Sequence, residues 1–406
     1  MTGPLTGVRI LDLTHVWAGP LAVRFLSDLG AEVVKVEAPY GRGPRELPYE
    51  PLGGWLGGEP GEDSWNRNAI FTKQHRNRKS LCLDLKQNQG REVFLSLVRV
   101  ADIVIENFSA RAMPAMNLDY EILNAVNPNI IYITMPGFGT TGPYRERIAF
   151  GPTVEPMSGL TSMLGYGPDE PRNSAIALMD PICATNAAAA VTHALRIRDR
   201  EGTGSRVELS LHEGGVSYSG PWLLDTQLEQ PPVSVGNRHP SMAPHGVYPC
   251  QGEDAWIAVA CPDTDTWQRL TKLIDCNIES INLDDRIQQA DTIDAAIENW
   301  TCRFSPMEAA ELLQQAGVPA GPVNTTPEMT ADPQAVAREF FVPYERFDTP
   351  MPGSPLHMRG INRDEWTPCP GLGEHNAEVL SDWLSMAEEE IDLLHQKHVI
   401  FDSPPA

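Results

Sequence analysis

An aspartate at the start of a predicted helix has the clearest chemical potential in this sequence. Asp180 stands directly before Pro181, and an alanine-rich helix is predicted over residues 181–200. Because proline is favoured at the first helical position, Asp180 is a natural N-cap. The same position has a second interpretation, since a carboxylate near a helix N-terminus is stabilised as an anion and aspartate can act as a covalent nucleophile. The spacing alone does not choose between a helix cap and a catalytic carboxylate.

Basic residues gather near the ends of predicted strands. Arg76, Arg78 and Lys79 cluster before one strand, and Arg111 and Arg147 follow later ones. Such groups can hold phosphates through charge-assisted hydrogen bonds. The alternative for each single arginine is a solvated surface turn, and the sequence leaves both interpretations open.

Several common site motifs are absent from the sequence. The turn between the first strand and its helix, residues 14–20, contains one glycine. Binding of NAD or FAD there would need Gly-x-Gly-x-x-Gly, so these cofactors are not expected. There is no P-loop and no Gly-x-Ser-x-Gly elbow. The ten histidines and seven scattered cysteines do not cluster at metal-ligand spacing, so no metal is expected either.

The elements that must position these residues follow an α/β pattern. Strand-like residues 8–13, a helical segment over residues 20–29 and strand-like residues 32–37 form a βαβ unit, which implies a parallel sheet. The alternation continues with strands at residues 80–85, 101–105, 130–134 and 207–211. Ligands of such sheets lie beyond the carboxyl ends of the strands, where His15 and Trp17 are found.

The pattern changes near residue 220, where prolines interrupt the alternation and hairpin-like segments begin. We therefore predict a second, smaller α+β domain over residues 220–334. A helix is expected to open near residues 374–376, and the final segment is expected to return to the first domain.

The charge balance excludes some partners. The chain has 406 residues, with 54 acidic and 31 basic side chains and a net charge of −23. Nucleic acids and anionic membranes are polyanions, so neither is an expected partner. No signal peptide and no apolar run of membrane-spanning length are recognisable, and the scattered cysteines suit a reducing compartment, so we expect a cytoplasmic protein.

Segments along nearly the whole chain resemble the class III CoA-transferase family, also called CaiB/BaiF or formyl-CoA transferase-like. The resemblance rests on residues 7–20, 29–37, 77–86, 101–108, 137–144, 200–204, 236–240, 317–323 and 373–375, in family order. It implies a large Rossmann-like domain from residues 1–219 and 335–406, the smaller domain between them, and an interlocked homodimer.

The resemblance also implies a reaction. Asp180 matches the family's catalytic aspartate, which attacks an acyl-CoA thioester and forms an aspartyl acyl anhydride. The CoA thiolate then gives an aspartyl-CoA thioester, from which a second carboxylic acid takes CoA. Backbone amides near the helix start and near Trp17 are expected to stabilise the oxyanions. CoA is thus a substrate, and no permanently bound cofactor is implied.

The family pattern assigns further site residues. CoA contacts are expected from Val16, Arg78, Asn107, Phe108, Arg111 and Arg147, and the acyl pocket from His15, Trp17 and Phe150. Ala38 departs from the pattern, because formyl-CoA transferase has an arginine there beside the adenine.

Two more departures bear on the activity. Racemases of the family carry a histidine where this chain has Phe150, which disfavours α-proton exchange. The formyl and oxalate enzymes carry a glutamine at the position of Trp17 and a tetraglycine loop near residues 238–241, which predicts a different acyl group, dicarboxylic or aromatic. An acyl-CoA:carboxylate CoA-transferase is the leading hypothesis. An acyl-CoA racemase and a non-catalytic CoA-binding protein, with Asp180 only a cap, remain as alternatives.

Overall fold

The computed structural model describes residues 2–40, 54–167, 169–228, 233–278, 282–343 and 350–405. The chain forms two compact units. Unit 1 comprises Met1–Thr161, Asn173–Leu228 and Glu339–Ala406, and unit 2 comprises Ser162–Arg172 and Glu229–Arg338. The predicted domain limits lie at 219/220 and 334/335. Residues 162–172 and 335–338, predicted in the large domain, group with unit 2, and residues 220–228, predicted in the small domain, group with unit 1.

Six strands of the described chain form the parallel sheet of unit 1, in the order β3-β2-β1-β4-β5-β6. The strands are β1 Arg9–Asp12, β2 Glu32–Glu37, β3 Lys79–Cys82, β4 Ile103–Glu106, β5 Ile131–Thr134 and β6 Ser205–Glu208. Strands β1 to β5 are almost entirely buried, as is typical of parallel sheets, whereas the edge strand β6 is partly exposed. The predicted α/β class is confirmed. The strand order reverses between β1 and β4, and ligands of such sheets generally bind beyond the carboxyl ends of the strands at this point.

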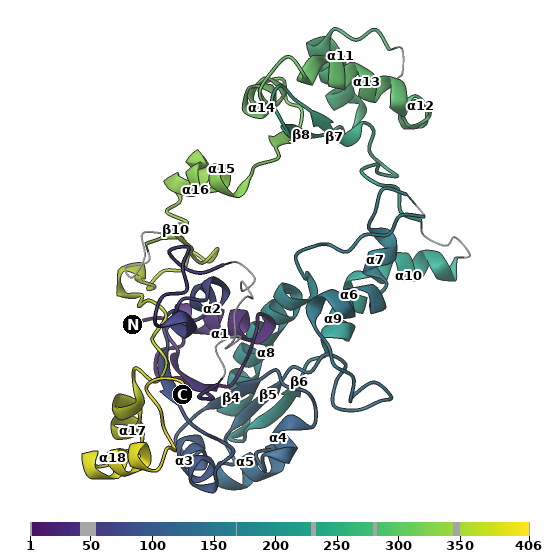
Figure 1. The fold of residues 1–406 in the computed structure, drawn as a ribbon. Coiled ribbons are helices and arrows are strands. Elements are labelled where there is room, and N and C mark those ends of the chain that lie inside the picture. Colours follow the sequence, from purple (N-terminus) through teal and green to yellow (C-terminus); the bar gives the residue numbers. More distant parts are fainter. Residues whose placement is uncertain are drawn as a thin grey trace. The chain divides into compact units, whose positions relative to one another are not determined.

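Helices cover both faces of this sheet (Figure 1). The helices of residues 1–228 and 350–405, with α7 at the limit between the two units, are α1 Ala18–Asp28, α2 Ala69–Gln74, α3 Asn88–Val98, α4 Ala112–Ala115, α5 Tyr120–Val126, α6 Gly151–Met157, α7 Leu160–Met163, α8 Met179–Glu201, α9 Leu211–Tyr218, α10 Gly220–Gln227, α17 Asn376–Leu384 and α18 Glu388–Gln396. One core joins the sheet to α1 and α8, and a second core joins its other face to α3, α5, α17 and α18. Small side chains such as Ala184 and Ala187 let α8 pack closely in the first core.

The C-terminal segment completes unit 1. Strands β10 Phe341–Val342 and β11 Met351–Pro352 pair with each other, and Ile400 bridges Leu83 beyond β3. Trp383 and Leu394 lie in the second core beside residues of β1 and β2. The side chain of Asn376, at the start of α17, accepts the Cys82 N–H at 2.9 Å, so the sheet and the last helices are joined by polar contacts as well as by the core.

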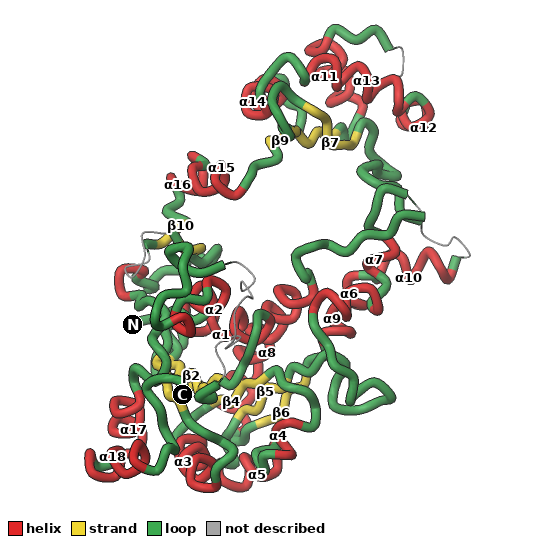
Figure 2. The backbone as a smooth tube through the Cα atoms, viewed as in Figure 1, coloured by secondary structure: helices red, strands yellow, loops and turns green. Residues whose placement is uncertain are grey.

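Unit 2 is a small α+β body, as predicted (Figure 2). Its antiparallel sheet has the order β7-β8-β9, from β7 His245–Pro249, β8 Trp256–Ala260 and β9 Ala320–Pro322. Its helices are α11 Thr264–Ile274, α12 Leu283–Gln288, α13 Ala290–Thr301, α14 Pro306–Gln315, α15 Thr326–Ala331 and α16 Pro333–Ala337. Trp267 and Trp300 occupy its core. Among the described residues of both units, no helix has the length and apolarity that a membrane crossing requires.

Candidate active site

Asp180 lies in the first turn of α8, which begins at Met179, two residues earlier than an Asp180 cap would allow. The N-cap is Leu178, and no side chain caps the helix, so the predicted N-cap role of Asp180 is wrong. The cause is the chain that enters the helix, where Ala175 and Ala177 have φ angles of 61° and 49°. This left-handed conformation is uncommon for residues other than glycine, and such strain concentrates at functional sites. Because it does not cap the helix, the Asp180 carboxylate is left for other contacts.

The carboxylate of Asp180 is buried, with 7% of the residue exposed. Burial raises its pKa from 3.8 to about 6, and a hydrogen bond from the backbone N–H of Ala18 opposes that rise. Gly151, at the start of α6, lies so close that a Cβ there would stand 2.0 Å from Asp180 Oδ2. Asp180 is therefore mostly ionised at neutral pH and more basic than an exposed aspartate, which favours a nucleophilic role.

The amides at the start of α8 are engaged within the chain. The N–H of Asp180 donates to Ala177 O at 3.0 Å, and that of Ile182 to Leu178 O at 3.3 Å. Pro181 has no N–H to offer. The Asp180 carboxylate instead receives the Ala18 N–H, from the turn after Trp17. Oxyanion stabilisation by either group of amides stays a prediction.

Cys183 lies one turn further along α8 and is also buried. Burial and the neighbouring Asp180 charge raise the pKa of its thiol to about 12. A nucleophilic cysteine needs its thiolate form. Cys183 is therefore a protonated neighbour of Asp180, whereas the carboxylate is the ionised group.

The turn that contains Ala18 meets residues from β4 at the reversal of strand order. The Asn107 side chain accepts the His15 N–H at 2.7 Å and donates to the His15 carbonyl at 2.8 Å. The rings of His15 and Phe108 stand 5.2 Å apart. Burial and the positive charge of Lys35 lower the pKa of His15 to about 4, so its imidazole is neutral at physiological pH. Val16 is exposed at the outer edge of this turn.

Arg78 does not occupy the position predicted for a phosphate contact. Its guanidinium is fully buried, pairs with Asp12 at 2.5 Å and donates to the carbonyls of Pro20 and Gln74. Asp12 also bonds Thr14, at the start of the same turn. Burial alone would raise the pKa of Asp12, but Lys35 and Arg78 together hold it below 3.8. The observed geometry thus gives Arg78 a structural role beneath the turn.

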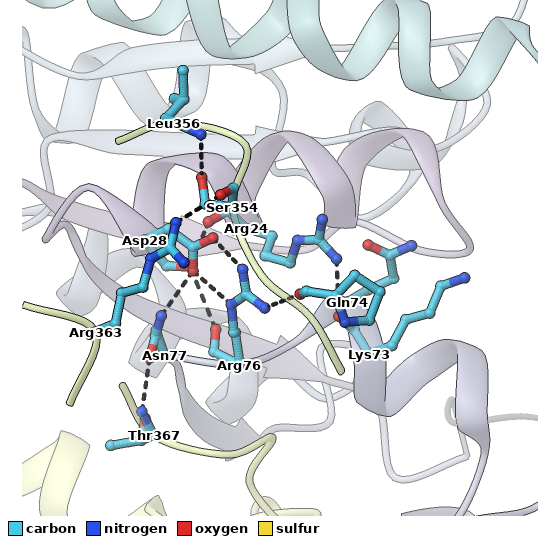
Figure 3. A network of polar contacts seen from close by, with 12 residues as sticks. Arg24, Asp28, Lys73, Gln74, Arg76, Asn77, Ser354, Leu356, Arg363 and Thr367 are labelled. Carbon is cyan, nitrogen blue, oxygen red and sulfur yellow. Dashed lines mark hydrogen bonds and ion pairs between the residues drawn. The ribbon is translucent and has the colours of Figure 1, made fainter. Parts of the chain in front are cut away.

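The neighbouring basic residues are used in the same way. Arg76 forms a two-pronged pair with Asp28 of α1, at 2.8 and 2.6 Å, and also donates to the Pro352 carbonyl. Asn77 bonds Asp28 and Thr367, so α1, the segment before β3 and the C-terminal segment are held together (Figure 3). Lys79 pairs with Glu378 at 3.0 Å. In this structure the cluster is neutralised by the chain's own carboxylates.

The remaining predicted residues lie outside these contacts. Arg111 is exposed before α4, and Arg147 is exposed with its guanidinium 3.7 Å from the Tyr144 ring centroid. Phe150 is 55% exposed and immediately precedes Gly151. Trp17 is half-buried, with the Lys73 ammonium 5.7 Å from its ring centroid. Ala38 is exposed just beyond β2. No group of three metal-ligating side chains lies together within the described residues.

Sequence reasoning pointed to backbone amides near Trp17 without naming Ala18, and it did not identify Gly151 as a neighbour of Asp180. Ala18 acts through its backbone N–H, which no side-chain pattern reveals. Gly151 acts through the absence of a side chain. Its place directly after Phe150 in the sequence was the available signal, but the approach to Asp180 is a tertiary contact.

Known proteins match this chain over nearly its whole length. The family model of CoA-transferase family III matches residues 5–376. The succinate–glutarate CoA-transferase of Agrobacterium fabrum is 32% identical over 93% of this chain and 95% of its own. The succinyl-CoA–D-citramalate CoA-transferase of Chloroflexus aurantiacus is 30% identical over 98% of both chains. The crystal structure of a CaiB/BaiF family protein from Brucella suis matches with a TM-score of 0.82 and 28% identity, over 94% of this chain and 100% of that one. The family match covers both units and every predicted site residue, and the chain therefore belongs to CoA-transferase family III.

Proposed function

We propose that this CoA-transferase moves CoA between two carboxylic acids with Asp180 as its covalent nucleophile. The observation that carries the proposal is the state of the Asp180 carboxylate. It is buried, has a pKa of about 6 and receives the Ala18 N–H. A carboxylate of this kind is ionised at pH 7 and only partly solvated, so it can attack a thioester carbonyl.

The proposed sequence of steps balances without another reactant. An Asp180 oxygen attacks the donor thioester carbonyl, the C–S bond breaks, and an aspartyl acyl anhydride and CoA thiolate result. The thiolate attacks the aspartyl carbonyl, which releases the donor acid and leaves an aspartyl-CoA thioester. The acceptor carboxylate attacks that thioester and forms a second anhydride with release of the thiolate. The thiolate then attacks the acceptor acyl carbon, which gives the new acyl-CoA and frees Asp180. The Ala18 N–H is placed to stabilise the oxyanions at the aspartyl carbon.

The carboxylic acids themselves belong to the proposal. The two named relatives act on succinyl, glutarate and citramalate groups, which supports a dicarboxylic acid as one substrate. Trp17 stands directly beside Ala18, and we propose that it, His15 and Phe150 shape the acyl pocket. Val16 and Phe108 are proposed contacts of CoA, and the exposed Arg111 and Arg147 are proposed for its phosphates. The observed ion pair of Arg78 favours leaving it out of that set.

The test is to trap the intermediate. The enzyme is incubated with succinyl-CoA and no acceptor, then treated with hydroxylamine, which converts an activated aspartyl group to a hydroxamate. We expect a hydroxamate on the peptide that contains Asp180 and none in Asp180→Ala. A matched control is Asp265→Ala, which removes a first-turn aspartate of α11 in unit 2 and should retain the adduct. Normal CoA transfer by Asp180→Ala would reject Asp180 as the nucleophile, and absence of transfer by the wild type with any acceptor acid would support a non-catalytic CoA-binding protein.

A racemase of the same family is the alternative reaction. It would need a base beside the acyl α-carbon, and Phe150 offers no titratable group at the position where racemases carry histidine. The purified enzyme is incubated in deuterated water with one enantiomer of a 2-methylacyl-CoA and no acceptor acid. We expect no deuterium at the α-carbon. Deuterium incorporation that depends on Asp180 would replace the transferase mechanism with proton exchange.

We also propose that two copies assemble as the interlocked homodimer typical of the family. Support comes from apolar side chains exposed on consecutive helices of unit 1. They are Ile197 on α8, Tyr218 on α9, and Leu223 and Leu224 on α10. Exposed apolar groups of this kind are typical of interaction surfaces. Light scattering should give twice the 44.7 kDa chain mass at micromolar concentration, and a monomer would contradict the proposal.

A further inference from the structure

The loop between β1 and α1 holds a backbone conformation that its own sequence disfavours. Val16 has a φ angle of 65°. A β-branched residue is a genuine outlier in this left-handed region, because its branched Cβ crowds the backbone. The Val16 side chain is 61% exposed, so packing of that side chain does not hold the angle. Contacts elsewhere in the loop must do so.

Asn107 makes those contacts. Its Oδ1 accepts the His15 N–H at 2.7 Å, and its Nδ2 donates to the His15 carbonyl at 2.8 Å. One side chain thus fixes both polar backbone groups of the residue before Val16. The loop also folds tightly around this amide, because a Cβ at Gly19 would stand 3.2 Å from Asn107 Cγ and 2.4 Å from Thr14 Cβ.

The sheet in turn holds Asn107. It directly follows Glu106, the last residue of β4, which is 2% exposed. The Glu106 carboxylate accepts the Phe108 N–H at 2.7 Å and the Tyr132 hydroxyl at 2.8 Å. The N–H after Asn107 is thus held by Glu106, and Glu106 is held by β5 through strand pairing and the Tyr132 hydroxyl, which makes the Asn107 amide a rigid support for the loop.

We propose that Asn107 is a positioning residue that holds the β1–α1 loop so that the Ala18 N–H points at the Asp180 carboxylate. This proposal rests on the nucleophilic role of Asp180. It differs from the CoA contact that the family pattern assigns to Asn107, because the effect passes through the loop backbone. Without the His15 contacts the strained loop relaxes, and the hydrogen bond that favours the ionised carboxylate is lost.

Titratable groups lie on α8 itself and on the elements packed against it. They include Cys183 on α8, His15 and Lys35 beside the loop, Arg24 and Asp28 on α1, Glu155 on α6, His212, Glu213 and Tyr218 on α9, Tyr132 on β5, Arg206 and Glu208 on β6, and His193 and the charged residues of the last turns of α8. The pKa of Cys183 is about 12 and that of His15 about 4. Desolvation and the Ala18 N–H are the causes that set the pKa of Asp180. Loss of the Ala18 bond should therefore raise it above 6.

The test compares Asn107→Ala with Asn127→Ala across pH 5–9. Asn127 is a matched control, since its side chain likewise makes two backbone hydrogen bonds, here as donor to the carbonyls of Val98 and Ala101, both at 2.9 Å. For Asn107→Ala we expect kcat to fall about tenfold or more, with the acid limb of kcat moved to higher pH and KM for acyl-CoA within about twofold. Asn127→Ala should keep the wild-type profile.

Two results would overturn the proposal. A higher KM with an unchanged acid limb would make Asn107 a CoA contact, and an equal loss in both variants would make its role general stability. If Asn107→Ala does not fold, Asn107→Ser is used, because its short hydroxyl cannot span both His15 groups. Failure of this proposal can be told from failure of the proposed function by hydroxylamine trapping on the wild type. Absence of the wild-type adduct refutes Asp180 as the nucleophile, whereas the pH profiles of the two asparagine variants report on the loop.

Discussion

A single methyl group added at Gly151 should disable the site. The Cβ of Gly151→Ala would stand 2.0 Å from Asp180 Oδ2 and 2.9 Å from Ala177 Cβ. Ordinary van der Waals contact begins at 3.4 Å, so the carboxylate oxygen or the start of α6 must move by about 1.4 Å, the difference between the two distances. The new methyl would therefore crowd the Asp180 carboxylate and the Ala177 side chain at the same time.

The expected loss follows from that displacement. A misplacement of about 1 Å at a reacting group can cost about a hundredfold in rate, which corresponds to about 2.7 kcal/mol in the activation barrier. Overpacking should also lower the free energy of unfolding by about 1–3 kcal/mol. We therefore expect kcat for CoA transfer from succinyl-CoA to fall about a hundredfold or more, while the protein still folds. The rate is measured by chromatography of the CoA esters, and stability by urea unfolding.

Gly214→Ala is the control for overpacking alone. A Cβ at position 214, in α9, would stand 2.7 Å from Cys183 Sγ, so it presses on the same helix one turn beyond Asp180. We expect a similar stability loss and a kcat within a few fold of wild type. The reasoning is refuted if Gly151→Ala keeps the wild-type kcat, or if Gly214→Ala loses as much activity at equal stability.

Three further predictions concern charge. Because the folded pKa of Asp180 is raised from 3.8 to about 6, the stability linked to this group is present below pH 3.8 and lost as pH rises through 6. Asp180→Asn should therefore abolish CoA transfer yet raise the free energy of unfolding at pH 8 by up to about 3 kcal/mol. Urea titrations should show that this gain shrinks toward pH 4, and equal gains at both pH values would contradict the prediction. Arg78→Met leaves Asp12 buried without its 2.5 Å partner and should cost about 3–5 kcal/mol of unfolding free energy, whereas unchanged stability with weaker CoA binding would restore the phosphate role. The folded pKa of His15 is lowered to about 4, so its contribution to stability is present above pH 6.5 and is lost as pH falls through 4. In NMR spectra the C2 proton resonance of His15 should stay constant between pH 5.5 and 8. A titration midpoint above pH 6 would contradict the lowered pKa.

The basic cluster shows where sequence reasoning about this protein reaches its limit. Arginines near strand ends in an acidic chain fit a phosphate site and a solvated surface turn equally well. The structure shows a third arrangement, in which Arg76 and Arg78 are buried against Asp28 and Asp12. Those partners are 48 and 66 residues away in sequence. A pairing over such distances depends on how α1 and the strands pack, which no local pattern records.

The sequence by itself determined the βαβ alternation, the strands of the parallel sheet and the choice of Asp180. The alternation and the strands follow from apolar periodicity, and the choice of Asp180 follows from the family resemblance; both are read along the chain. Only the tertiary structure decided what surrounds Asp180. The Ala18 N–H, the missing Cβ of Gly151 and the burial that raises the carboxylate pKa come from three separate segments. Ala18 acts through its backbone N–H, Gly151 through the space that its missing side chain leaves, and burial through desolvation of the carboxylate. These effects on Asp180 arise only after the segments pack together.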